Sequence, residues 1–100
     1  MEVLSKIKYI KDENKKKWWI LSSLCKEVGL ENNTTNLTKL IQYKDHKKIR
    51  IDGKGQWIVV VNNKGLFMIV MTITVRNNCK DIIKGLREEL LEQYKVKFND

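Results

Sequence analysis

The chain has 100 residues, which is room for one small domain with a single core. Its apolar fraction of 42% and charged fraction of 32% are ordinary for a folded protein and argue against intrinsic disorder. No apolar run reaches the roughly 18 residues of a membrane span. The first residues also lack the continuous apolar stretch of a signal peptide. We therefore predict one intracellular domain over residues 1–100, with no second effector domain and no membrane association.

The charge is strongly positive. Twenty Lys and Arg residues against twelve Asp and Glu give a net charge of +8, and the excess lies mainly in residues 1–17 and 44–64. A clustered basic surface attracts polyanions, chiefly through contacts with phosphates. Most of the cations are lysines, however, and Lys, Asn and Ile are all abundant, which an A/T-rich coding sequence also produces. Nucleic-acid binding and compositional bias both remain open as explanations of the charge.

Residues that carry chemistry are few. Cys25 and Cys79 lie far apart, and together with His46 they cannot supply the four ligands of a structural zinc ion. The five glycines are scattered and form no phosphate-binding loop. Glu88 and Glu89 are neighbours on a predicted helix, where adjacent side chains point about 100° apart, so we expect a solvated face and no catalytic pair. The expectation is a protein without enzymatic activity, metal or cofactor.

The chain is predicted to begin with a β-hairpin and a short helix. Val3–Lys11 alternates in hydropathy as a strand does, and Trp18–Leu21 is an aromatic and apolar run that fits the returning strand. A short helix follows, with Ser22 or Ser23 as its N-cap and Gly29 as its left-handed stop. Cys25 lies on the apolar stripe of this helix and is expected to pack as a small hydrophobic residue.

A second short helix and a second hairpin come next. Thr34 or Thr35 is a suitable cap for a helix whose apolar face holds Leu37, Leu40 and Ile41. Residues 48–52 and 56–62 then read as two strands joined by a turn at residues 52–55. The unbroken apolar run at residues 58–61 indicates burial on both faces of its strand.

The last third of the chain starts with an ambiguous segment and ends in a clear helix. Residues 66–75 have the propensity of a strand, but Asn62 can also cap a short buried helix over residues 64–71. Further on, Asn77 or Asn78 is a suitable cap for the final helix. Its apolar stripe consists of Ile82, Ile83, Leu86, Leu90 and Tyr94. Its polar face consists of Lys84, Arg87, Glu88 and Glu92.

Several short motifs occur in a fixed order: Trp18-Trp19-Ile20, Leu24–Leu30 with Asn32, Asp45–Lys48, Gly55-Gln56 and Val61–Phe67. Over residues 6–71, this order resembles the Bro-N domain of phage antirepressors and of the baculovirus repeated-ORF proteins. The resemblance implies that the Asn62 step begins a helix, and we adopt that prediction. The resemblance ends at residues 71–78, which lack the basic, proline-containing stretch usual in the family. The predicted fold is α+β and Bro-N-like, with an N-terminal β-hairpin, two short helices, a second β-hairpin and a C-terminal helix.

The function implied by the resemblance is duplex-DNA binding and gene control by a phage-type regulator in the cytoplasm of the host cell, with a homodimer as one expected assembly. Long cations around the loop before the second hairpin can reach phosphates, and the first hairpin can extend that surface. Polar side chains at a helix start can donate to phosphates or to base edges. The residues predicted to contact DNA are Lys15, Lys16, Lys17, Asn33, Thr35, Asn36, Lys44, Lys47, Lys48, Arg50 and Lys54.

The alternative is a small interaction protein that keeps the scaffold and blocks another protein, such as a repressor or a nucleic-acid-processing toxin of the host. The scarcity of arginine, the preferred residue for reading guanine, favours this alternative, whereas the lysine excess favours DNA. Strand alternation places Trp18 and Trp19 on opposite faces, so one of them is free to be exposed and to anchor a partner. The residues predicted for this role are Trp18, Trp57, Arg87 and Leu91.

Overall fold

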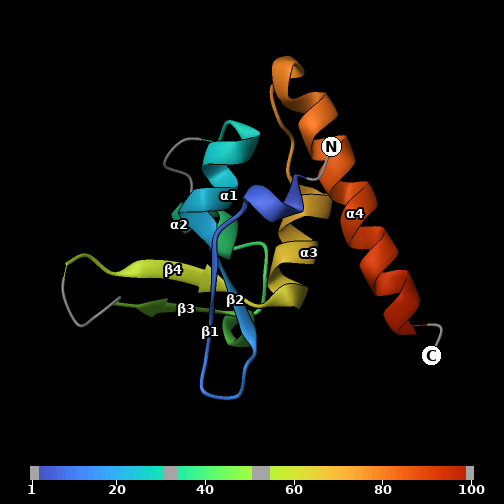
Figure 1. Cartoon of the computed structure of the whole chain (residues 1–100). Coiled ribbons are helices and arrows are strands. Elements are labelled where there is room, and N and C mark those ends of the chain that lie inside the picture. The colour runs from blue at the N-terminus through green and yellow to red at the C-terminus, as the bar shows by residue number, and fades with distance from the viewer. Residues whose placement is uncertain (1–2, 31–33, 51–54, 99–100) are drawn as a thin grey trace.

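The protein combines one antiparallel four-stranded sheet with four α-helices in the described residues, which confirms the predicted α+β class (Figure 1). The computed structural model describes residues 3–30, 34–50 and 55–98, and the side chains of residues 94–98 are outside this description. The strands are β1 (Tyr9–Lys11), β2 (Lys17–Ile20), β3 (His46–Ile49) and β4 (Ile58–Val61). The α-helices are α1 (Leu21–Val28), α2 (Thr34–Thr38), α3 (Asn63–Thr72) and α4 (Lys80–Phe98). Single 3-10 turns cover Leu4–Lys6, Tyr43–Asp45 and Asn77–Cys79.

The strand order β1-β2-β4-β3 fixes the two faces of the sheet. Tyr9, Trp19, Val61 and His46 form one row across the four strands, because they are register partners. Successive residues of a strand point to opposite faces, so the neighbours of these residues lie on the other side. Trp19 and Val61 belong to the main hydrophobic core, which identifies the face that the helices cover.

The core lies between this face of the sheet and the helices. In Figure 1, α3 lies between the sheet and α4, and it packs against β2, β4 and α4. Three of the helices supply fully enclosed side chains, and β4 supplies Val61: the helical ones are Leu21, Leu24, Val28, Leu66, Ile69, Val70 and Leu86. The predicted apolar stripe of α4 is confirmed at Ile83, Leu86 and Leu90, which are buried. Ile82 is half-buried against the core, and the side chain of Tyr94 lies outside the described residues. Cys25 is also buried, as expected of a small hydrophobic residue in this position.

A buried polar connection begins α3 where the Asn62 prediction places it. The side-chain oxygen of Asn62 accepts a hydrogen bond from the Gly65 N–H at 2.8 Å, which is the geometry of an N-cap. The Asn62 amide donates to Asp45 Oδ1 at 2.9 Å, and its backbone N–H donates to the Asp45 carbonyl at 3.0 Å. A Cβ on Gly65 would lie 2.9 Å from that carbonyl, so this position needs glycine. The helix over the ambiguous segment is therefore confirmed, and it is tied to the turn before β3.

The N-terminal segment differs from the predicted strand, because only Tyr9–Lys11 pairs in the sheet. The Glu89 carboxylate on α4 accepts hydrogen bonds from the backbone N–H groups of Val3 and Leu4, both at 2.7 Å. These bonds hold the segment in a 3-10 turn, and Val3 and Leu4 are buried beneath it. The solvated role expected of Glu89 was therefore wrong, and a contact distant in sequence overrides the local alternation.

The helix ends also differ in part from the predictions. Helix α1 begins directly after β2 at Leu21 without a side-chain cap, and the hydroxyl of Ser23 instead accepts a hydrogen bond from the Lys8 N–H. Gly29 does stop α1 in the left-handed conformation, at φ 75°. Helix α2 ends at Thr38, so Leu40 lies beyond it and is exposed. The two asparagines proposed to cap α4 lie in the 3-10 turn that precedes it, and most of the second hairpin turn falls outside the described residues.

Candidate nucleic-acid interface

Asp12 organises the turn between β1 and β2. Its Oδ1 accepts hydrogen bonds from the backbone N–H groups of Asn14 and Lys16, at 2.8 and 3.0 Å, as aspartate often does at the start of a turn. Its Oδ2 accepts the indole N–H of Trp18 at 3.0 Å. These donors, with the Trp18 indole first, hold the pKa of Asp12 below its ordinary value of 3.8. The turn and the indole are thus fixed to each other by one carboxylate.

Two lysines from distant parts of the sequence meet at Trp18. The ammonium nitrogen of Lys16 lies 5.0 Å from the centre of the indole ring, and that of Lys47 lies 4.2 Å from it. Both distances are within the range of cation–π attraction. The indole is only 7% exposed, and it lies outside the main core. Two positive charges therefore lie against one aromatic side chain on the face of the sheet opposite Trp19.

The strand order explains why these two lysines meet. Lys47 on β3 is the register partner of Val60 on β4, and Val60 is the partner of Ile20 on β2. Trp18 is two residues before Ile20 and therefore lies on the same face. The lysine side chain thus reaches across β4 to the indole on β2. The first hairpin and the second basic segment are therefore close at this point, which is the condition under which its lysines could extend the predicted surface.

Lys17 does not join this cluster, because it follows the alternation of β2 to the helix-covered face. Its ammonium nitrogen lies 4.7 Å from the ring centre of Tyr9 and 5.5 Å from that of Trp19. Those two rings contact each other, with their centres 5.2 Å apart. The three consecutive lysines expected to act together are thus divided: Lys16 lies on one face of the sheet, Lys17 lies on the other, and Lys15 is exposed in the turn with φ 62°.

A second pairing of a cation with an aromatic ring lies beside the β3–β4 hairpin. The guanidinium carbon of Arg50 is 4.5 Å from the ring centre of Trp57, just before β4. Trp57 is 58% exposed, so this stack faces solvent. Arginine offers five donors in a planar fork that suits phosphate oxygens. This pair therefore adds a hydrogen-bonding cation and an exposed aromatic surface to the hairpin.

The remaining residues predicted to contact DNA are spread over several elements. Lys44 is exposed in the 3-10 turn before β3, and Lys48 is exposed on β3 on the face opposite Lys47. Thr35 and Asn36 are exposed on α2, although Asn36 also makes a contact of its own. The predicted contacts Asn33 and Lys54 lie outside the described residues. Asp12 was missed, and its place at the start of a polar turn was the one sequence signal for it.

The four residues predicted for protein binding do not form one surface. Both tryptophans of β2 are buried, which corrects the expectation that one of them is exposed: the core covers Trp19, and Trp18 lies beneath its two lysines. Arg87 is half-buried and donates to backbone carbonyls of the segment that ends α3. Trp57 and Leu91 are exposed, but β4 and α4 lie at opposite sides of the molecule (Figure 1).

Among the described residues, no group of three or more His, Cys, Asp or Glu side chains is arranged to hold a metal ion. Within the same parts of the chain, no helix has both the length and the apolar character needed to cross a membrane. Comparison of the chain with protein-family models, with curated proteins and with solved structures finds no match. The functional argument therefore rests on the residues and their geometry.

Proposed function

We propose that the protein is a phage-type regulator that binds duplex DNA, as its resemblance to the Bro-N domain implies. The observation that carries the proposal is the convergence of Lys16 and Lys47 on the Trp18 indole. Two ammonium groups against one ring make a local excess of positive charge, which attracts a phosphate. The Asp12 carboxylate offsets one of these two positive charges, since Lys47 is close enough to help lower its pKa, and the other charge remains for a phosphate.

Phosphate contacts position the protein on the duplex in this proposal. Lys16 and Lys47 bind backbone phosphates, and Arg50 with the exposed face of Trp57 offers a second, separate contact at the turn end of the hairpin. The net charge of +8 supplies the long-range attraction, which does not depend on the DNA sequence. Binding through phosphates releases counterions, so the affinity falls steeply as the salt concentration rises.

The test is fluorescence anisotropy with a random-sequence duplex, measured over salt concentrations from about 50 to 200 mM. Each phosphate contact contributes about −0.9 to the slope of log K against log salt, so Lys16→Ala with Lys47→Ala should make the slope shallower by about 2. The matched control is Lys80→Ala with Lys84→Ala, which removes the same charge from exposed positions on α4. We expect the control to keep most of the slope.

Two results would contradict the proposal. Failure of the unaltered protein to bind at the lowest salt concentration excludes duplex DNA as the ligand. An equal loss of slope in both double variants means that net charge alone drives binding, without a site at Trp18. A light-scattering mass, measured with and without the duplex, tests the expected homodimer in the same samples.

A further inference from the structure

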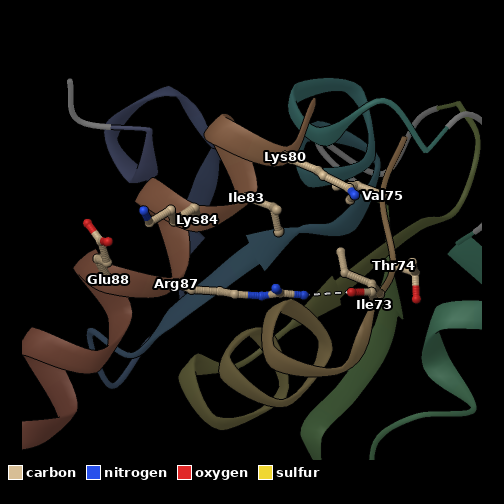
Figure 2. Close-up of a pocket in the computed structure, with 8 residues that line it drawn as sticks. All are labelled: Ile73, Thr74, Val75, Lys80, Ile83, Lys84, Arg87 and Glu88. Carbon is tan, nitrogen blue, oxygen red and sulfur yellow. Dashed lines mark hydrogen bonds between the residues drawn. The ribbon is translucent and has the colours of Figure 1, made fainter. Parts of the chain in front are cut away.

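A groove lies between the start of α4 and the segment that connects α3 to α4, as Figure 2 shows. Its volume is about 500 Å³, which is within the range of sites that bind small ligands. It is formed by Ile73, Thr74, Val75, Lys80, Ile83, Lys84, Arg87 and Glu88. None of these residues belongs to the sheet face that carries Trp18, so the groove is a separate surface.

The floor of the groove is apolar, and its rim is basic. Ile73, Val75 and Ile83 supply the apolar side chains. Lys80 and Lys84 are both exposed and stand four residues apart on α4, so they project along the same side of the helix. Glu88 is the single acidic residue in the lining. The surface thus pairs an apolar strip with an excess of positive charge.

Arg87 holds the two walls of the groove together. Its Nε donates to the Val70 carbonyl at 2.9 Å, and one terminal nitrogen donates to the Ile73 carbonyl at 2.6 Å (Figure 2). Carbonyls at the end of a helix lack partners within that helix, so a cation from another element stabilises them. These hydrogen bonds fix α4 against the connecting segment, so the groove is formed before any partner arrives. A preformed groove lowers the entropy cost of binding.

We infer that this groove binds an acidic, amphipathic peptide segment of a partner protein. Aliphatic side chains of the segment cover the apolar floor, and its carboxylates pair with Lys80 and Lys84. Charge complementarity selects an acidic partner. A nucleic-acid backbone fits less well, because it has no aliphatic group to cover the apolar floor. The connecting segment is extended at both ends, with ψ 152° at Ile73 and 156° at Arg76, so an extended peptide can lie along it.

The probe is a fluorescein-labelled synthetic peptide of alternating glutamate and leucine, titrated with the full chain. We expect affinity in the micromolar range that weakens at least about tenfold in Lys80→Glu with Lys84→Glu, since opposed charges are replaced by like charges. A peptide with serine in place of leucine should also bind at least about tenfold more weakly, because it cannot cover the floor. Both lysines are exposed, so the variant should keep the unfolding midpoint of the parent chain.

Two double variants that lose the same charge are then compared for peptide binding. The first is Lys16→Ala with Lys47→Ala, which serves as the control, and the second is Lys80→Ala with Lys84→Ala. We expect the first pair to leave peptide affinity unchanged and the second to reduce it, which is the reverse of their expected effects on DNA. The inference is overturned if the glutamate–leucine peptide does not bind, if the serine peptide binds equally well, or if the Trp18 lysines matter as much as those on α4. Since the two assays use different ligands and opposite controls, the failure of one proposal leaves the other testable.

Discussion

Replacing Asn62 with alanine should destabilise the protein more than any exposed polar substitution. The side chain is only 7% exposed, and it does two things at once. Its oxygen caps α3 through the Gly65 N–H, and its amide donates to the buried carboxylate of Asp45. Alanine removes both interactions, and it leaves a backbone donor and a carboxylate in a place that water reaches poorly.

The size of the effect follows from these two losses. An N-cap is worth about 1 kcal/mol, and a hydrogen bond to a charged group is worth about 1.5 to 3 kcal/mol. The expected loss in the free energy of unfolding is therefore about 2.5 to 4 kcal/mol. Single domains are stable by only about 5 to 15 kcal/mol, so the variant should stay folded but unfold at a midpoint lowered by more than about 10 °C.

Urea unfolding followed by tryptophan fluorescence measures this loss, since the indole N–H of Trp19 donates to Asn63, the first residue of α3. Asn14→Ala is the matched control, because that residue is exposed in a turn and should change stability by less than about 0.5 kcal/mol. A double-mutant cycle with Asp45→Ala should show strong coupling between the two positions. A loss below about 0.5 kcal/mol in Asn62→Ala, or additive effects in the cycle, would refute the reasoning.

Three further predictions concern other polar contacts. The pKa of Asp12 is lowered in the folded protein, so its contribution to stability is present above the unfolded value and is lost as the pH falls through the folded value. The fluorescence of Trp18 should therefore respond to acid below pH 3.8, and Asp12→Asn should abolish this response. Arg87→Met should lower the free energy of unfolding, measured in urea, by about 1 to 3 kcal/mol, whereas Lys84→Met on the same helix should not lower it. Equal effects would contradict the role of the Arg87 hydrogen bonds between α3 and α4. Glu89→Ala should speed hydrogen exchange at the backbone amides of Val3 and Leu4, which donate to this carboxylate. Unchanged exchange there would show that the carboxylate does not hold the segment.

The elements that the sequence predicts well are those with a local cause. Gly29 ends α1 because the left-handed conformation there suits glycine, and this requirement is visible in the sequence. At Asn62 the local signals conflict, because the capping side chain favours a helix and the strand-like residues that follow favour a strand. The resemblance to the Bro-N domain decided for the helix. The apolar stripe of α4 repeats at helical spacing, so its buried face was predictable as well.

The features that sequence reasoning missed depend on contacts between distant residues. Residues 3–7 alternate as a strand does, but Glu89 on α4 supplies the acceptors that keep them in a 3-10 turn. The sequence places Arg87 on a solvated helix face, but its side chain donates to the carbonyls at the end of α3 and is half-buried there.

The candidate site depends on distant contacts in the same way. The convergence of Lys16 and Lys47 requires β4 to lie between β2 and β3, and no local pattern encodes that order. The basic segments could therefore be named from the sequence, but the pair that meets at one indole could not.

β3 lies at one edge of the sheet, and its lysines therefore also affect self-association. An edge strand offers backbone groups to any other strand that approaches, and it is a common starting point for aggregation. Lys47 and Lys48 project to opposite sides of this strand, so a second copy of β3 would meet like charges on both faces. Removing these charges by mutation, or screening them with high salt, should therefore make the protein more prone to form β-aggregates.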